Sequence, residues 1–284
     1  MKYFLLMIAF LSHDVSASPD AIYGEDNRID PYATSNPLLL KMASATAAMI
    51  PKTNLNIAGN ATTITGKALG DIYKLCPTER FRSQPTAANC SGTLIAPDII
   101  MTAGHCYDLA KMNCRDFSWV FDYRVSKEKQ LSVTVPTSKV YNCQSVILKE
   151  YVFPSGFDHA LVKLDRPVSD RDFAKIRATD SLKLGDEVVL IGHPSGLPTK
   201  IAPGGYVLKL ETISFKTNVD AFSVNSGSGV FNAKTGELEG ILASGRSDYN
   251  GAGNCSSAIV YRMDEGSETV QKPTRILEFL KTYK

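Results

Sequence analysis

Three side chains in the sequence could together perform nucleophilic catalysis: His105, Asp158 and Ser226. A serine hydroxyl attacks a carbonyl carbon at neutral pH only when a neighbouring base removes its proton, and histidine commonly serves as that base. A buried carboxylate must hold the histidine in the correct tautomer, and two N–H donors must face the oxyanion that forms. The elements that carry these residues must therefore meet in one cleft.

The segments around the histidine and the aspartate suit this arrangement. His105 follows the apolar run 99–103 and opens a turn, and Asp158 directly precedes the apolar run 160–164. Each residue is thus expected at the mouth of a strand, where a side chain can reach a cleft. Asp165 is a rival carboxylate, but its place before an Arg-Pro pair fits a surface turn better.

Longer stretches around these residues resemble the trypsin-like serine proteases. Residues 90–106, CSGTLIAPDIIMTAGHC, are similar to the histidine motif of that family, and residues 158–164, DHALVKL, to its Asp-x-Ala-Leu-x-x-Leu segment. Residues 224–232, VNSGSGVFN, resemble the Gly-Asn-Ser-Gly-Ser-Pro-Val-Phe-Asn motif of the bacterial glutamyl-endopeptidase-like branch. A Ser- and Gly-rich loop alone is common in β-proteins. The order His–Asp–Ser, which differs from the orders in subtilisin and the α/β-hydrolases, joins the three motifs into one pattern.

The resemblance extends from Cys76 to the C-terminus. It implies that His105 is the general base, Asp158 orients it and Ser226 is the nucleophile. Residues 22–28, IYGEDNR, are similar to the Gly-x-Asp-x-Arg opening of mature glutamyl-endopeptidase-like enzymes. We therefore expect the N-terminal arm to stay with the enzyme after processing.

Two residues beside Ser226 depart from the family pattern. The family has glycine at the position of Val224, where the backbone N–H groups of Val224 and Ser226 would form the oxyanion hole. A β-branched residue is strained there if its φ must be positive, and loss of one donor costs on the order of 10²–10³ in rate. Trypsin-like animal enzymes have an aspartate at the position of Asn225 that pairs with a new N-terminus, and asparagine cannot form that ion pair. The loop is expected to take another competent shape or to turn a donor into place when substrate binds; impaired catalysis is the third alternative.

The substrate-binding residues are predicted from the same resemblance. Asp220 stands where trypsin-like enzymes have the base of the S1 pocket, and an aspartate there selects Arg or Lys through a charge-assisted contact. Ser244 and Gly245 would form the pocket wall. Glutamate-specific relatives have a histidine at the position of Leu242, so glutamate recognition is not supported. The alternative for Asp220 is a residue that caps a loop.

The six cysteines are an even number, and no C-x-x-C spacing suggests a metal site. The resemblance implies a disulfide between Cys90 and Cys106. The other four cysteines allow three pairings. Because Cys114 and Cys143 each precede an apolar strand of the first barrel, we expect them to pair, which leaves Cys76 with Cys255. No metal or cofactor is expected.

The N-terminal residues predict export. Residues 1–17 have a basic start at Lys2, an apolar run over 3–11 and small residues before the end, as in a secretory signal peptide; a buried first strand is the alternative. The run is too short to span a bilayer, and no later segment is a candidate span. We expect a secreted or periplasmic protein, in which the cysteines are oxidised. The net charge of +2, from 31 basic and 29 acidic residues, argues against nucleic acid as the main partner.

Short apolar runs separated by turn residues predict an all-β fold after Cys76. The predicted strands are residues 92–96, 99–103, 117–123, 131–135, 145–148, 160–164, 187–191, 205–210, 221–224, 229–231 and 238–242. Apolar residues at helical spacing predict a helix over 37–50 and a short C-terminal helix over 274–283. With the resemblance, the pattern indicates two six-stranded antiparallel β-barrels, chymotrypsin-like, with a short C-terminal helix.

These observations divide the chain into four parts. They are a signal peptide (1–17), an N-terminal arm or pro-segment (18–75), a first barrel with His105 and Asp158 (76–175), and a second barrel with Ser226, the S1 pocket and the C-terminal helix (176–284). The predicted function is a secreted, monomeric serine endopeptidase that acts on proteins or peptides, after Arg or Lys if Asp220 forms the pocket base. A protease-fold binding protein impaired by Val224 is the alternative, and an esterase is the second.

Overall fold

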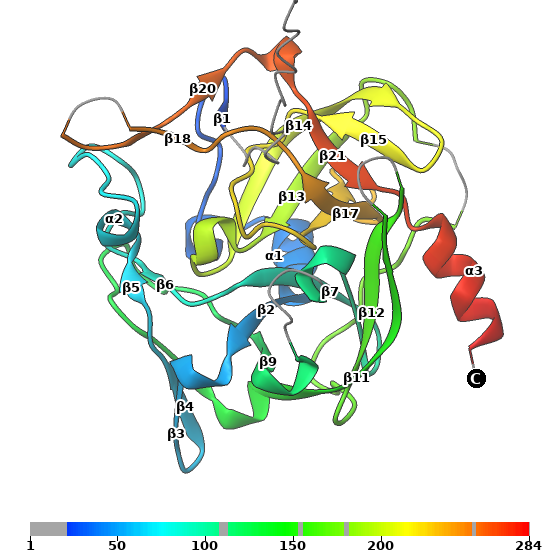
Figure 1. Ribbon diagram of the computed structural model, residues 1–284, viewed down its shortest axis with the longest axis horizontal. Coiled ribbons are helices and arrows are strands. Elements are labelled where there is room, and N and C mark those ends of the chain that lie inside the picture. The colour runs from blue at the N-terminus through cyan, green and yellow to red at the C-terminus, as the bar shows by residue number, and fades with distance from the viewer. Residues whose placement is uncertain (1–21, 108–112, 153–155, 179–181, 252–253, 284) are drawn as a thin grey trace, which may run out of the picture.

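The computed structural model describes residues 22–107, 113–152, 156–178, 182–251 and 254–283. The expected signal peptide lies outside these residues. Runs rich in Val, Ile and Leu form strands because branched side chains pack well on a pleated surface. The strands close into two antiparallel barrels of six strands each (Figure 1). The expected chymotrypsin-like architecture is confirmed.

The first barrel has the strand order β11-β12-β8-β7-β2-β9. Its strands are β2 (Thr46–Pro51), β7 (Cys90–Ala96), β8 (Ile99–Thr102), β9 (Phe117–Phe121), β11 (Val140–Tyr151) and β12 (Asp158–Leu164). The fully buried side chains of Trp119, Phe121 and Leu161 belong to its core. Ala160 of β12 pairs with Thr102 of β8. The end of β8 and the start of β12 therefore lie at the same edge of the barrel.

The second barrel has the order β13-β14-β15-β21-β17-β16. Its strands are β13 (Glu187–Gly192), β14 (Lys200–Leu210), β15 (Ser214–Thr217), β16 (Gly229–Asn232), β17 (Leu238–Ser244) and β21 (Glu268–Gln271). Leu190, Phe215 and Val230 lie in its core. The segment between β15 and β16 carries Ser226, so its path depends on what packs beside it.

The N-terminal region differs from the sequence-based prediction. The helix α1 covers only Pro37–Ser44, and the side chain of Asn36 caps it by accepting a 2.9 Å hydrogen bond from the Leu38 N–H. β2 follows at once and pairs with both β7 and β9. The hydrogen bonds that close the barrel outweigh the helical spacing of the apolar residues. The first barrel thus begins at Thr46, and the expected boundary at Cys76 is wrong.

The predicted strand at residues 221–224 is also wrong. This segment is a loop, and its apolar residues are buried by tertiary contacts rather than by a sheet. Phe222 has no exposed surface, and the guanidinium carbon of Arg28 lies 3.8 Å from the centre of its ring. Period and composition cannot distinguish such a loop from a buried strand.

Shorter elements surround the barrels. The strands are β1 (Ile22–Tyr23), β3 (Leu55–Ala58), β4 (Ala61–Ile64), β5 (Lys67–Ala68), β6 (Pro85–Thr86), β10 (Val133–Pro136), β18 (Tyr249–Asn250), β19 (Ser257–Ala258) and β20 (Val260–Tyr261), and the helices are α2 (Leu69–Ile72) and α3 (Thr274–Thr282). The predicted C-terminal helix is confirmed by α3. In the described ranges, no helix combines the length and apolar character that a membrane crossing requires.

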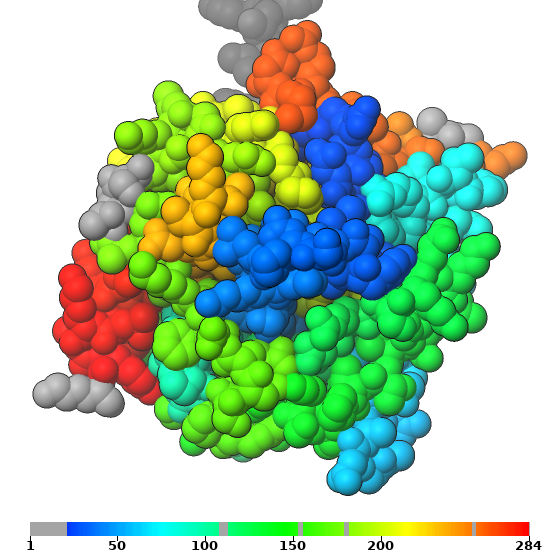
Figure 2. Space-filling view, turned by 180° about the vertical axis from the view of Figure 1, so that it is seen from behind, coloured from blue at the N-terminus to red at the C-terminus, as the bar shows by residue number. Residues whose placement is uncertain are grey.

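The N-terminal part of the chain spreads over the back of the molecule. Figure 2 shows it in blue, between the yellow and orange second-barrel segments and the green first-barrel segments. β1 pairs in parallel with β20, and Ile29 exchanges two backbone hydrogen bonds of 2.8 and 2.9 Å with Ile201. Residues before α1 therefore belong to the body of the second barrel.

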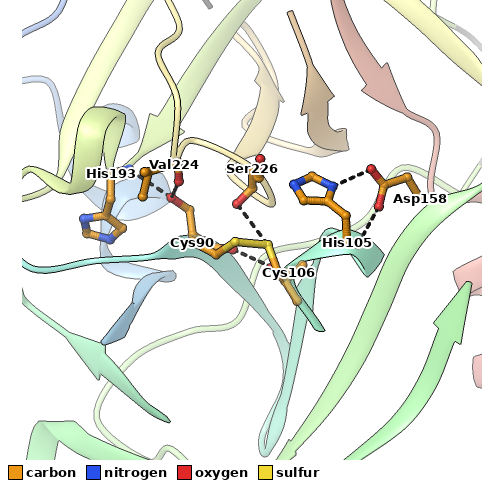
Figure 3. Close-up of a disulfide and its surroundings, with 9 residues drawn as sticks. Cys90, His105, Cys106, Asp158, His193, Val224 and Ser226 are labelled. Carbon is orange, nitrogen blue, oxygen red and sulfur yellow. Dashed lines mark hydrogen bonds and ion pairs between the residues drawn. A yellow bond between two sulfur atoms is a disulfide. The ribbon is translucent and has the colours of Figure 1, made fainter. Parts of the chain in front are cut away.

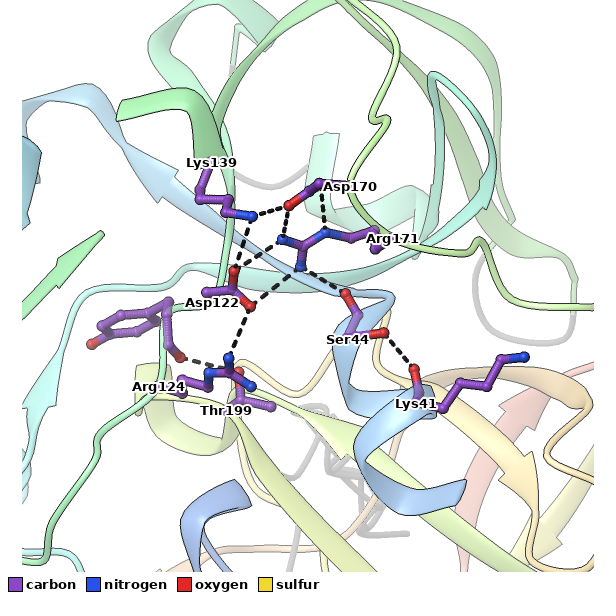
Figure 4. A network of polar contacts seen from close by, with 9 residues as sticks. Lys41, Ser44, Asp122, Arg124, Lys139, Asp170, Arg171 and Thr199 are labelled. Carbon is purple, nitrogen blue, oxygen red and sulfur yellow. Dashed lines mark hydrogen bonds and ion pairs between the residues drawn. The ribbon is translucent and has the colours of Figure 1, made fainter. Parts of the chain in front are cut away.

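A polar network fixes the linker between the barrels to the first barrel (Figure 4). Arg171 donates to Asp122 at 2.9 Å, to Asp170 at 3.0 Å and to the carbonyl oxygen of Ser44 at 2.9 Å. Lys139 also contacts both carboxylates. Burial alone would raise the pKa of Asp122, but the hydrogen bonds and positive charges around it outweigh burial and lower the pKa.

Three disulfides are present, and their partners are the expected ones. Cys90 is bonded to Cys106, Cys114 to Cys143 and Cys76 to Cys255. The Cys76–Cys255 bond closes a loop of 179 residues and joins the segment before the first barrel's β7 to the second barrel. The Cys90–Cys106 bond closes a loop of only 16 residues and lies beside Ser226 (Figure 3).

Candidate active site

His105 and Asp158 face each other at the edge where β8 ends and β12 begins. A 3₁₀ turn, Gly104–Tyr107, follows β8 and directs His105 toward β12. Asp158 Oδ2 lies 2.6 Å from His105 Nδ1, and Asp158 Oδ1 accepts a 2.9 Å hydrogen bond from the His105 backbone N–H. A carboxylate that binds both groups fixes the ring and favours the proton on Nδ1, which leaves Nε2 available as a base.

Ser226 comes from the second barrel, in the nucleophile loop, which we define as residues 218–228. The Ser91 N–H donates a 2.9 Å hydrogen bond to the Ser226 carbonyl oxygen, and Cys106 Sγ lies 3.9 Å from the same atom. Figure 3 shows the His105 imidazole between Asp158 and Ser226, with its free edge toward the serine. Within the described ranges, Ser226 Oγ and His105 Nε2 are not joined by a direct hydrogen bond.

Gly227 allows the nucleophile loop to approach the first barrel closely. Its φ is 82°, and a Cβ atom there would lie 2.2 Å from both Ser91 O and Thr102 Oγ1. Any side chain would push the loop away from β7 and β8. The glycine after Ser226 is therefore required for the three candidate residues to meet.

At Val224 and Ser226, two backbone N–H groups lack a protein acceptor among the described residues. The Ser223 carbonyl oxygen accepts a 2.6 Å hydrogen bond from the Ser195 N–H. Because the C=O and N–H of a trans peptide point in opposite directions, the Val224 N–H points away from Ser195. In the part of the chain that the structure describes, neither the Val224 N–H nor the Ser226 N–H donates to a protein atom. A free pair of N–H groups next to a serine is suited to bind an oxyanion.

Comparisons with known proteins place this geometry in a family. A family model described as a trypsin-like peptidase domain matches residues 90–241, which include His105, Asp158 and Ser226. The chain belongs to the trypsin-like peptidase family. No curated protein matches its sequence.

Many solved structures share the fold, and two of them serve as examples. A Glu endopeptidase in complex with MPD superposes with a TM-score of 0.54 at 18% identity, covering 92% of this chain and 100% of its own. The Vibrio cholerae VesB protease superposes with a TM-score of 0.53 at 13% identity, covering 90% of this chain and 67% of its own. At such low identities the likeness concerns the fold alone.

Val224, the departure from the trypsin-like family pattern, does take the strained conformation. Its φ is 73°, which is unfavourable for a β-branched residue. The side chain is half-buried against an apolar cluster that includes Ala88, Tyr123 and Val125. These contacts offset part of the strain, so the loop accepts valine without losing the free N–H group.

Asp220 does not present a free carboxylate to a pocket. The residue is only 3% exposed. Its Oδ1 accepts a 2.8 Å hydrogen bond from the Tyr23 N–H, and its Oδ2 accepts a 2.7 Å hydrogen bond from the Asn27 N–H. Burial raises its pKa to about 6, against the opposite effect of these two bonds. The contacts do not support a base for Arg or Lys recognition and fit the alternative of a loop anchor.

The other predicted pocket residues lie beside the nucleophile loop. Ser244 ends β17 and is exposed, and Gly245 follows it, half-buried. Leu242 on the same strand accepts a 2.8 Å hydrogen bond from the Gly227 N–H. Ser244 and Gly245 thus lie at the end of a strand that is hydrogen-bonded to the nucleophile loop. Among the described residues, no three His, Cys, Asp or Glu side chains cluster as metal ligands would.

The sequence analysis did not identify Ser91, His193 and Ser195 as residues that support the nucleophile loop. Ser91 Oγ accepts a 3.0 Å hydrogen bond from the His193 N–H and lies 3.4 Å from Val224 O. Burial lowers the pKa of His193 to about 3, so its ring is neutral and structural. Ser195, at φ 51°, supplies the N–H that orients the Ser223 carbonyl. Residues 192–196, GHPSG, are dense in turn formers, but nothing in them indicates this contact.

Proposed function

We propose that the protein is an exported serine endopeptidase that cleaves peptide bonds with His105, Asp158 and Ser226. The observation that carries the proposal is the double contact of Asp158 with His105, on an imidazole whose other edge faces Ser226. Binding alone does not require three residues in this arrangement, whereas acyl transfer does.

The reaction follows from the positions of these groups. Ser226 Oγ turns toward His105 Nε2 when substrate enters, since catalytic hydrogen bonds often tighten only in the complex. His105 takes the serine proton as Oγ attacks the carbonyl carbon, and Asp158 stabilises the imidazolium. His105 then protonates the leaving amine, which gives an acyl-enzyme. It next activates the water that releases the acyl group and restores Ser226.

The free N–H groups of Val224 and Ser226 would bind the oxyanion of the tetrahedral intermediate. Such donors stabilise the negative charge that develops in the transition state, and each contributes on the order of 10²–10³ to the rate. The orientation of the Ser223 carbonyl toward Ser195 supports a hole that is already open. It argues against the alternative of a binding protein impaired by Val224.

The three disulfides and the predicted leader support a secreted or periplasmic location. The substrate is a protein or peptide, and no nucleic acid partner is proposed. We propose a monomer. Since both oxygens of Asp220 are engaged, we propose no preference for Arg or Lys at the cleaved bond.

The test is labelling of the disulfide-intact protein with a fluorophosphonate probe, beside hydrolysis of Arg-, Glu- and Phe-site peptides and of a matching ester. Labelling is expected in the wild type and in Ser35→Ala, an exposed-serine control, and is expected to vanish in Ser226→Ala. Hydrolysis of the ester but of no peptide would favour an esterase. A folded wild type that neither labels nor hydrolyses would favour the binding-protein alternative.

A further inference from the structure

The nucleophile loop is supported by a segment from the start of the described chain. We call residues 22–33 the arm. Its Tyr23 is 1% exposed and its Arg28 is 4% exposed, which are low values for a terminal segment. The arm is therefore packed as tightly as a core element, and its contacts show what it holds.

The first support is Asp220, near the start of the loop. Both of its oxygens accept backbone N–H groups of the arm, from Tyr23 and Asn27. Tyr23 is fixed in turn, because its hydroxyl donates a 2.6 Å hydrogen bond to Glu268 Oε1 on β21. The arm thus bridges β21 and the nucleophile loop through one buried residue.

The second support lies two residues further along the loop. The Arg28 guanidinium stacks on the Phe222 ring and forms a 2.8 Å ion pair with Asp26. The Phe222 carbonyl oxygen accepts a 3.0 Å hydrogen bond from the Asn225 N–H, which closes the turn that contains Val224. Phe222 therefore connects the arm directly to the turn that carries one of the free N–H groups.

The arm has its own anchor in the second barrel. Lys200 at the start of β14 is 1% exposed and lies 2.5 Å from Asp30 Oδ1, and it also donates a 2.7 Å hydrogen bond to Gln84. Gln84 donates to the second oxygen of Asp30 at 3.0 Å. Since a buried pair with all groups hydrogen-bonded is costly to break, these contacts hold the arm independently of its contacts with the nucleophile loop.

We propose that the arm is a positioning element of the active site, in which Asp220 ties residues 23–27 to the nucleophile loop and keeps the Val224 and Ser226 N–H groups in place. The inference rests on the proposed function, because the shape of the loop affects activity only if Ser226 is catalytic. Asp220 acts through the loop, so it is a positioning residue.

The experiment compares Asp220→Ala and Asp220→Asn with the wild type. The alanine variant loses both acceptors, and we expect its fluorophosphonate labelling rate, measured per folded molecule, to fall about ten- to hundredfold, since small misplacements of reacting groups have such effects. The asparagine variant keeps one oxygen acceptor, so its labelling rate should lie between those of the wild type and the alanine variant. The backbone N–H groups of Asn225, Gly227 and Ser228 belong to the loop and donate hydrogen bonds to carbonyl oxygens. They should exchange with deuterium faster in the alanine variant.

Asp122→Asn is the matched control. It weakens another heavily bonded carboxylate, whose ion-pair partners Arg124, Lys139 and Arg171 lie outside the nucleophile loop. It should therefore lower the melting temperature with much less effect on the labelling rate of the folded protein (Figure 4). If Asp220→Ala does not fold, Tyr23→Phe removes only the hydroxyl that binds Glu268 and should slow labelling in the same direction. Wild-type labelling rates in the Asp220 variants, or an equal loss in Asp122→Asn, would overturn the proposal.

The readouts also separate this proposal from the proposed function. If the wild type does not label, the endopeptidase assignment fails, and deuterium exchange alone decides about the arm. Faster exchange confined to residues 222–228 would then support the arm as the element that holds the loop. Unchanged exchange there would overturn it.

Discussion

Two carboxylates, the partly buried Asp158 and the buried Asp220, use both oxygens to hold a partner, but over very different separations in the sequence. Asp158 binds His105, which is 53 residues away in the turn that follows β8, a neighbouring strand of the same barrel. Asp220 binds the backbone of Tyr23 and Asn27, which are 197 and 193 residues away. His105 is thus positioned by the barrel that carries it, whereas the nucleophile loop contacts a distant segment.

This difference predicts how substitutions on each side of the candidate site affect it. The His105 side has β8, β12 and their ladder of hydrogen bonds behind it. The Ser226 side is a loop whose position depends on Ser91, the Cys90–Cys106 disulfide, the Ser195 N–H and the arm. Substitutions far from the active site in the sequence should therefore displace Ser226 more than they displace His105.

The largest effect is expected for Asp158→Asn, which alters the contacts that orient His105. The amide favours the wrong tautomer of His105, and kcat should fall about 10⁴-fold with little change in melting temperature. Steady-state kinetics on the best peptide substrate measures this. Asp165→Asn is the control at the other end of β12, where Asp165 accepts a 2.8 Å hydrogen bond from Asn142, and it should retain full kcat. A large loss in the control would mean that the carboxylates were assigned wrongly.

Removal of single disulfides should separate stability from activity. The chain-entropy relation gives about 5 kcal/mol for the 179-residue loop and about 3 kcal/mol for the 16-residue loop. The Cys76→Ser/Cys255→Ser pair should therefore lower the urea midpoint more. The Cys90→Ser/Cys106→Ser pair should slow labelling of the folded protein more, since this bond touches Ser226. The reverse ranking in labelling would contradict a local role for Cys90–Cys106.

The pH dependence of stability should distinguish Asp220 from Asp122. The folded pKa of Asp220 is raised from 3.8 to about 6, so its contribution to stability is present below about pH 4 and is lost as pH rises through 6. Relative to Asp220→Asn, the wild type should lose up to about 3 kcal/mol between pH 4 and 7, because each pKa unit is worth about 1.4 kcal/mol.

Asp122 has a lowered pKa, so its contribution is present above its ordinary pKa and is lost as pH falls below it. Urea midpoints of the wild type and both asparagine variants from pH 3 to 7 measure the two trends. Parallel curves for the two pairs would contradict the difference between a carboxylate whose pKa is raised by burial and one whose pKa is lowered by neighbouring cations.

The smallest effect is expected for Val224→Gly. Relief of the strain at φ 73° gains about 1–3 kcal/mol, and loss of the half-buried side chain costs about 1–2 kcal/mol. The net change in unfolding free energy should lie between a loss of about 1 and a gain of about 2 kcal/mol. Labelling should not slow, because glycine keeps the N–H group. Chemical denaturation and the labelling rate measure this. Markedly slower labelling would show that the valine side chain itself shapes the loop.

Much of the fold and the candidate site could be predicted from local patterns. The motifs around His105, Asp158 and Ser226 are each continuous in the sequence and each contains or adjoins a strand, so short-range spacing carries the information. The barrels, α3 and the disulfide partners followed from the same patterns. Each of these features depends on residues that are neighbours in the sequence, or on a family resemblance that implies how distant residues are arranged.

Only the tertiary structure decided where β2 belongs, what residues 221–224 do and which groups Asp220 binds. Closure of the first barrel overrides the helical spacing after Ser44, because unpaired strand edges cost more than a weak helix gains. The partners of Asp220 are backbone N–H groups, which every residue but proline carries, so no side-chain pattern marks them. The composition of the sequence therefore could not reveal that a buried aspartate beside the nucleophile faces the arm instead of the substrate.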